Sequence, residues 1–105
     1  AQGLSLKDFN NLLDTDLPVL IDFHTKWCAP CRKMAPVIDK LQKEFDGRAT
    51  VLRVDADNSK NIAELYHIKG VPVFILFENG NEVWRNTGII KEEALRTVIN
   101  DAIKK

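Results

Sequence analysis

Runs of apolar residues along the chain identify the strands first. Val19–Phe23 and Val73–Phe77 are nearly continuous apolar runs rich in β-branched and aromatic residues, which is typical of strands covered on both faces. Thr50–Asp55 has the same character, with Arg53 as a charged residue inside it. These three runs predict a buried sheet.

Apolar residues that recur every third or fourth position predict the helices. Ser5 stands three residues before Asp8, which is a capping pattern for the first helix. Pro36 lies inside the second helix and is expected to kink it. The predicted helices are Leu6–Asp14, Met34–Phe45, a short segment through Ile62, Leu65 and Tyr66 that Asp57–Ser59 would cap, and Glu92–Ile103.

Connections between these elements predict how the sheet is built. A strand, a helix and a second strand in succession give a right-handed crossover and two parallel strands. Asn79–Gly80 is a strong hairpin signal. It joins Val73–Phe77 to a last strand over Glu82–Thr87, so these two strands run antiparallel. The order of elements predicts one α/β domain over residues 1–105 with a mixed sheet.

Composition and charge narrow the classes of partner. Lys and Arg total 15 and Asp and Glu total 15, so no overall field attracts nucleic acid or an anionic membrane. No apolar run approaches the roughly 20 residues that a membrane span needs. Ala1–Ser5 is not a signal peptide, although an exported protein whose signal had been removed would look the same. We therefore expect partners to be chosen by local features.

Cys28 and Cys31 are the only cysteines and lie between a predicted strand and a predicted helix. A tight turn into a helix start brings two such sulfurs close. Pro30 suits that turn, because its φ is fixed and a first helical turn leaves N–H groups unpaired. Those N–H groups and the helix dipole favour negative charge on Cys28. We therefore assign Cys28 as the nucleophile and Cys31 as the resolving thiol.

Two other uses of the cysteine pair stay open. A zinc site would need two further ligands, and the chain offers only His24 and His67. A purely structural disulfide would close so short a loop that it would constrain the unfolded chain only weakly. The position between a strand and a helix favours reversible chemistry.

Asp22 interrupts the first apolar run just before the cysteines. Burial would disfavour its charge and raise its pKa, whereas a neighbouring Arg53 would oppose that rise, so the direction of the net change stays open. Asp22 could instead be an ordinary acid at a pleat edge or in a structural ion pair. The stem of Arg53 could equally lie along the sheet edge with its head in water.

A set of residues surrounds the cysteines in a fixed order: Asp22–Phe23, Trp27-Cys28-Ala29-Pro30-Cys31, Ala35–Pro36, Asp55 with Asp57, Gly70-Val71-Pro72, Asn79–Gly80 and Gly88. This set resembles the thioredoxin family over nearly the whole chain. A lone pair of cysteines two residues apart is a weak signal, whereas the complete set in this order is a strong one.

The resemblance implies a thioredoxin fold, with a central mixed sheet of four to five strands and helices on both faces. The first strand would be short, because only Ala1–Leu4 remain to form it. About 5 to 6% of X-Pro bonds in folded proteins are cis, which by itself favours a trans bond between Val71 and Pro72. The resemblance instead implies a cis bond that sets Pro72 against Cys28.

Roles for the surrounding residues also follow from the resemblance. Asp22 would act as general base for Cys31, through water. Ala29, Pro30 and Arg53 would tune the redox potential. An extended substrate would pair its backbone with Val71 and rest on uncharged neighbours; the residues implied to bind substrate are Trp27, Val71, Pro72, Gly88 and Ile89.

Six positions depart from the family pattern, and two of them are Thr25 and Lys26. His24 replaces a usual tryptophan, Ala29 a usual glycine, Arg53 a frequent lysine and Val73 a usual threonine. His24 has three interpretations: a half-exposed residue at a strand end, which we favour, a pH-sensitive modulator of Cys28, or a metal ligand.

The implied activity is protein-disulfide reduction by dithiol–disulfide exchange, with electrons from a separate reductase of the thioredoxin-reductase type. It needs no metal and no organic cofactor. We expect a cytoplasmic monomer without a nucleic-acid or membrane partner, or a periplasmic or secreted protein if a signal was removed. Two alternatives are an exported oxidant or isomerase on the same fold, and a binding module with idle cysteines.

Overall fold

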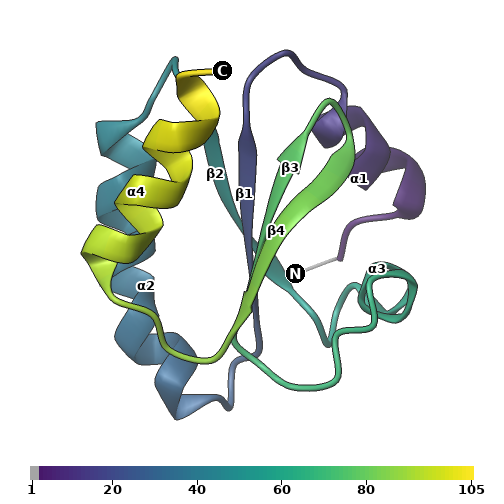
Figure 1. Ribbon diagram of the computed structural model, residues 1–105. Helices are drawn as coiled ribbons and strands as arrows, with labels where there is room; N and C mark the ends of the chain where they lie inside the picture. The colour runs from purple at the N-terminus through teal and green to yellow at the C-terminus, as the bar shows by residue number, and fades with distance from the viewer. Residues whose placement is uncertain (1–2) are drawn as a thin grey trace.

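The computed structural model describes residues 3–105 as a mixed sheet between two layers of helices (Figure 1). Its four strands have the order β2-β1-β3-β4. The helices α2 and α4 cover one face, and α1 and α3 cover the other (Figure 1). The elements are α1 (Leu6–Leu13), β1 (Val19–His24), α2 (Ala29–Glu44), β2 (Thr50–Asp55), α3 (Lys60–Leu65), β3 (Val73–Glu78), β4 (Asn81–Thr87) and α4 (Glu92–Ile103).

The strand directions agree with the predicted connections. The crossover through α2 makes β1 and β2 parallel, and the hairpin makes β3 and β4 antiparallel. Asn79 and Gly80 have φ of 51° and 80°, as a tight hairpin turn requires. The thioredoxin fold implied by the resemblance is confirmed.

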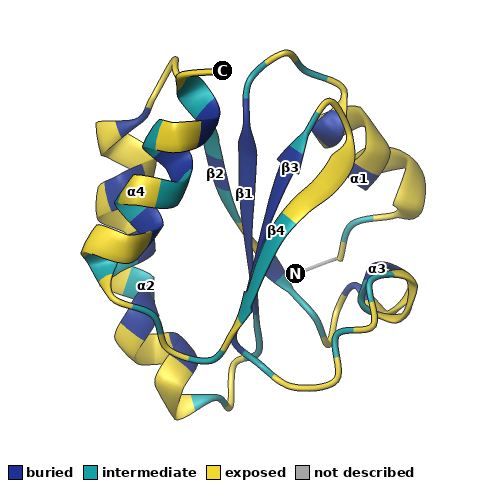
Figure 2. Ribbon diagram, viewed as in Figure 1, coloured by how far each residue is buried: buried dark blue, intermediate teal, exposed yellow. Residues whose placement is uncertain are grey.

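Burial follows the apolar runs (Figure 2). β1 and β3 are the central strands and are buried on both faces, whereas β4 at the sheet edge is mostly exposed or half-buried. Leu20 and Met34 belong to the core between the sheet and α2 with α4. Phe9 and Phe23 belong to the core on the α1 and α3 side, with ring centroids 6.3 Å apart. The sheet is therefore held between two separate apolar layers.

The sequence predicts that serine side chains cap the amino ends of α1 and α3. The Ser5 hydroxyl accepts from the Asp8 N–H over 3.0 Å, which confirms the first cap. The prediction that Ser59 caps α3 through its side chain is wrong, because its hydroxyl accepts instead from the Leu4 N–H over 3.1 Å. The predicted short first strand fell partly on residues 1–2, outside the described residues, and the structure assigns no strand to residues 3–5.

Candidate active site

Cys28 and Cys31 lie where β1 has ended and α2 begins, and they form a disulfide with Cα atoms 5.2 Å apart. Cys28 is the N-cap of α2, and its Sγ accepts a hydrogen bond from the Cys31 N–H over 3.1 Å. Pro30 occupies the first turn of the helix, where its missing N–H costs nothing. Cys28 is half-buried and Cys31 is 1% exposed. An incoming group therefore meets the sulfur of Cys28 first.

The surroundings of Cys28 favour a negative charge on its sulfur once the disulfide is reduced. The Cys31 N–H points at Cys28 Sγ, and the amino end of a helix carries partial positive charge. The first turn of α2 contains no acidic residue. Arg32 lies in the next turn, and its guanidinium donates to the Lys26 carbonyl over 3.0 Å. Features of this kind favour the thiolate, which is the reactive form of a cysteine, and the role of Cys28 as nucleophile stays a prediction.

Two further segments meet the cysteines at this end of the sheet. Cys28 Sγ lies 3.7 Å from the carbonyl oxygen of Val71. The Val71–Pro72 bond is cis, as the resemblance implies and contrary to the statistics of X-Pro bonds. The Gly88 N–H donates to the Pro72 carbonyl over 2.8 Å. The segments before β3 and after β4 are thereby fixed beside the start of α2.

The residues implied to bind substrate differ in exposure. Trp27 is 87% exposed and Ile89 is 58% exposed, although both are large and apolar. Val71 and Gly88 are half-buried, and Pro72 is buried. Exposed apolar side chains of this size are typical of contact surfaces. Their role in binding stays a prediction.

Asp22 is fully buried on the central strand β1. Its Oδ2 lies 3.4 Å from Arg53 Nε, across the β1–β2 register. Its Oδ1 is also buried and has no hydrogen-bond partner among residues 3–105. Burial raises the pKa of Asp22 to about 6, because the attraction of Arg53 offsets only part of the desolvation. The sequence left open whether the pKa of Asp22 is raised or lowered, and the structure shows that it is raised. The predicted pairing of Asp22 with Arg53 is present.

Asp22 and Cys31 face the same layer of the structure. Alternate residues of a strand share a face, so Asp22 lies on the same side of the sheet as Leu20, which packs in the core beneath α2. Cys31 is on the buried side of α2, together with Met34. A carboxyl group and the second sulfur are thus enclosed between one strand and one helix.

His24 lies half-buried at the end of β1, opposite Asp55 in the register. Burial and the positive charge of Arg53 lower the pKa of His24. These features confirm a half-exposed residue at a strand end. Across residues 3–105 no three His, Cys, Asp or Glu side chains come together as a metal site would require.

The sequence interpretation missed one residue that supports this site. The Asn86 side chain, near the end of β4, donates from Nδ2 to the Gly88 carbonyl over 3.1 Å. Gly88 has a φ of 95°, a conformation that favours glycine. An asparagine two residues before a glycine at a strand end is a recognisable turn signal.

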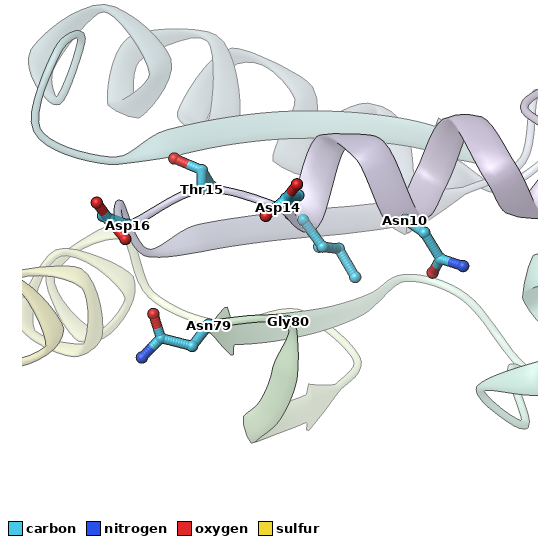
Figure 3. Close-up of a pocket in the computed structure, with 7 residues that line it drawn as sticks. Asn10, Asp14, Thr15, Asp16, Asn79 and Gly80 are labelled. Atoms are coloured by element: carbon cyan, nitrogen blue, oxygen red, sulfur yellow. The ribbon is translucent and has the colours of Figure 1, made fainter.

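A separate cavity of about 490 Å³ opens where α1 and the β3–β4 hairpin meet (Figure 3). Side chains of Asn10, Asp14 and Asp16 line it from α1 and the following loop, and Asn79 lines it from the hairpin. These lining residues include no cysteine and no histidine. The cavity lies at the end of the sheet opposite the cysteines and is separate from the disulfide.

Comparison with known proteins agrees with the geometry of the disulfide. The sequence model of the Thioredoxin family matches residues 2–101. The chain belongs to the thioredoxin family. A thioredoxin of Rickettsia felis is 38% identical over 92 residues, which cover 88% of each chain. A thioredoxin of Synechocystis is 34% identical over 89 residues, which cover 85% of this chain and 83% of the relative.

Solved structures of thioredoxins have the same fold. A mutant thioredoxin from Halobacterium salinarum superposes with a TM-score of 0.86 at 30% identity, covering 98% of this chain and 88% of that one. With Cys28 and Cys31 bonded at the start of α2, this member of the thioredoxin family is a thiol–disulfide oxidoreductase. Its substrates are disulfides, and its disulfide is restored to the dithiol by a reductase. None of the helices in residues 3–105 has the length and apolar character to cross a membrane.

Proposed function

We propose that the protein reduces disulfides in other proteins, with Cys28 as the nucleophile and Cys31 as the resolving thiol. The observation that carries this assignment is the asymmetry of the two sulfurs. Cys28 caps the helix and is half-buried, whereas Cys31 lies inside the first turn at 1% exposure. The more accessible sulfur, that of Cys28, is the one that a substrate disulfide reaches, and the enclosed sulfur of Cys31 attacks only afterwards.

The reaction proceeds in two exchanges that balance atoms and electrons. Cys28 thiolate attacks one sulfur of the substrate disulfide, forms a mixed disulfide and releases the other substrate sulfur as a thiolate. Cys31 then loses its proton and attacks Cys28 Sγ, which forms the Cys28–Cys31 disulfide and releases the second substrate thiol. Two electrons pass from this protein to the substrate. A separate reductase of the thioredoxin-reductase type then supplies two electrons to the Cys28–Cys31 disulfide and restores the dithiol.

Asp22 is proposed as the general base for Cys31, acting through water. A base whose pKa lies near the working pH is most effective, and the pKa of Asp22 is raised to about 6. Its buried Oδ1 has no partner among the described residues, so that oxygen is free to accept a proton. The ion pair between Arg53 and Oδ2 holds the carboxyl group in one orientation.

Substrate binding is proposed at the surface around Cys28. An extended segment of the substrate would pair its backbone with Val71, which lies beside Cys28 Sγ. The exposed side chains of Trp27 and Ile89 would contact apolar groups of the substrate. Ala29 and Pro30, which begin α2, would tune the redox potential together with Arg53. This mechanism requires no metal and no organic cofactor. We propose that the protein is a monomer that works in the cytoplasm, or in the periplasm or outside the cell if a signal was removed.

Reduction of insulin disulfides tests the nucleophile. We expect Cys28→Ser to lose the activity of the wild-type protein completely, because serine is neither as acidic nor as nucleophilic as cysteine. Equal rates for the variant and the wild type would overturn the assignment. Equilibration of the wild-type protein with glutathione then measures its reduction potential, and a strongly oxidising value would favour the alternative of an exported oxidant or isomerase.

Trapping of the mixed disulfide tests the resolving thiol. Cys31→Ser can complete the first exchange but not the second, so substrate proteins are expected to stay covalently attached to Cys28. Gel analysis with and without reductant detects them. If Cys31→Ser captures no substrate while wild-type protein reduces the same substrate, Cys31 is not the resolving thiol.

A further inference from the structure

Charges are unevenly distributed on this electrically neutral chain. Three segments meet at the disulfide end of the sheet: residues 24–33 at the start of α2, 67–73 around Pro72, and 87–91 after β4. We call their exposed surface the redox face. These segments contain no Asp or Glu and carry five Lys or Arg residues, namely Lys26, Arg32, Lys33, Lys69 and Lys91. All five are exposed.

These five cations have no ion-pair partner among residues 3–105. The salt bridges of that part of the chain use other cations, such as Lys40, Arg53 and Arg96. Asp55 is the acid nearest to the redox face along β2, but its carboxylate accepts from the N–H groups of Asp57 and Asn58 in its own turn. No ion pair among residues 3–105 engages the cations of the redox face, so they are available to carboxylates of a bound substrate.

The stability of α2 does not account for this arrangement. A helix dipole favours acids in the first turn and disfavours cations there. α1, with Asp8, and α4, with Glu92 and Glu93, follow this rule, whereas the first turns of α2 and of the short α3 contain no acid. The cations beside Cys28 would favour its thiolate, but Lys69 and Lys91 belong to other segments. The positive surface extends beyond what the thiolate alone requires.

We propose that the redox face selects substrate disulfides that are flanked by Asp or Glu. This inference rests on the proposed function and specifies its substrate class. An acidic segment laid along Val71 would place its carboxylates among cations that have no ion-pair partner among residues 3–105. Opposite charges raise the association rate and are screened by salt, with a Debye length of roughly 10 Å at 0.1 M. We therefore expect a higher kcat/KM for disulfides flanked by acidic residues than for those flanked by basic residues, and we expect this difference to be largest at low salt.

Three peptides with the same intramolecular disulfide test the proposal. Two residues on each side of the disulfide are Asp in the first peptide, Ser in the second and Lys in the third. The reduced wild-type protein is mixed with each peptide, and the second-order rate constant is measured in a single turnover. Rates with dithiothreitol correct for the intrinsic reactivity of each disulfide. We expect the Asp peptide to react about 10-fold faster than the Lys peptide at low salt, and the ratio to shrink towards one at about 0.5 M salt.

Charge reversal on the protein supplies the matched comparison. Lys69→Glu with Lys91→Glu is expected to abolish or invert the preference between the Asp and Lys peptides. Lys43→Glu with Lys104→Glu changes the net charge equally at the carboxyl ends of α2 and α4, far from the disulfide, and is expected to keep the wild-type ratio. Lys69→Gln with Lys91→Gln should give an intermediate ratio, and circular dichroism checks that each variant is folded.

The outcomes separate this inference from the proposed function. If the wild-type protein reduces all three peptides at equal corrected rates, the charge preference is wrong while disulfide reduction stands. A preference that the Lys43→Glu with Lys104→Glu control loses as well would also overturn it, because net charge and not the redox face would then be responsible. If the wild-type protein reduces no peptide faster than Cys28→Ser does, the proposed function itself fails.

Discussion

Two arginine–carboxylate groupings in this protein contain the same chemical groups in different surroundings. Asp22 and Arg53 meet beneath α2, where the carboxyl group is fully buried and its nearest contact to the guanidinium is 3.4 Å. Arg96 of α4 lies at the surface and contacts Glu44 of α2 and Glu92 of its own helix, each at 2.7 Å. Glu93 also pairs with Arg96.

The two groupings shift the pKa of their carboxyl groups in opposite directions. Burial raises the pKa of Asp22 to about 6 despite Arg53. Hydrogen bonds from Arg96 lower the pKa of Glu44 and of Glu92. The difference arises because the exposed acids stay solvated while they gain a partner, whereas Asp22 loses its water and gains one imperfect partner. The surface cluster fastens α4 to α2, and the buried pair keeps a proton acceptor available near neutral pH.

Removal of the Asp22 carboxylate is expected to have the largest effect on turnover. We expect Asp22→Asn to slow decay of the mixed disulfide by about 100-fold near pH 7, which is the lower range of general-base catalysis, while KM changes little. Rapid-quench analysis of one turnover follows the intermediate directly. Asp39→Asn, an exposed position on α2, is the matched control. Decay rates that are the same in Asp22→Asn and wild type from pH 6 to 8 would remove Asp22 from the mechanism.

The same substitution is expected to stabilise the fold in alkaline solution. The folded pKa of Asp22 is raised, so its contribution to stability is fully present below the unfolded pKa of 3.8 and is lost as the pH rises through about 6. Above that pH the native protein holds a charged carboxylate in its interior. The free energy of unfolding of Asp22→Asn, relative to that of the wild-type protein, should therefore be up to about 3 kcal/mol more favourable at pH 8 than at pH 4. Urea denaturation of both proteins at the two pH values measures this difference. A pH-independent difference would contradict the raised pKa.

Removal of the partner of Asp22 is expected to move the pKa still further. Arg53 lowers the pKa of Asp22 by its charge and by its hydrogen bond, and desolvation would act unopposed without it. Arg53→Met should shift the Asp22 titration above about 6, and Arg53→Lys should shift it less, because lysine keeps the charge. Carboxyl-carbon NMR titration reports the change. An unchanged midpoint in Arg53→Met would show that Arg53 does not tune Asp22.

Removal of Arg96 from the surface cluster is expected to have the smallest effect of these substitutions, and to change stability but not activity. We expect Arg96→Met to lower Tm by a few degrees, to do so less at high salt, and to leave insulin reduction unchanged, because exposed ion pairs contribute little and are screened. Thermal denaturation at two salt concentrations measures this effect. A loss of activity in Arg96→Met would mean that the cluster also supports the redox chemistry.

Local pattern accounts for most of the fold. The apolar runs of β1 and β3, the cap of Ser5 on α1 and the positive φ values of Asn79 and Gly80 all agree with the sequence predictions. These features depend on residues close together in the chain, so propensity and periodicity suffice to predict them. Ser59 behaves differently, because its hydroxyl is used by Leu4 from a distant part of the chain.

The cysteine chemistry was likewise readable from neighbouring residues, since Cys28, Pro30 and Cys31 occupy one helical turn. The approach of Val71 to Cys28 and the bond between Gly88 and Pro72 join segments that no periodicity relates. The direction of the pKa change in Asp22 also needed the structure, because burial raises it, Arg53 lowers it, and only the three-dimensional packing sets the size of each effect. The sequence by itself therefore determined which groups carry the chemistry, and the tertiary structure decided how solvent and charge around them tune it.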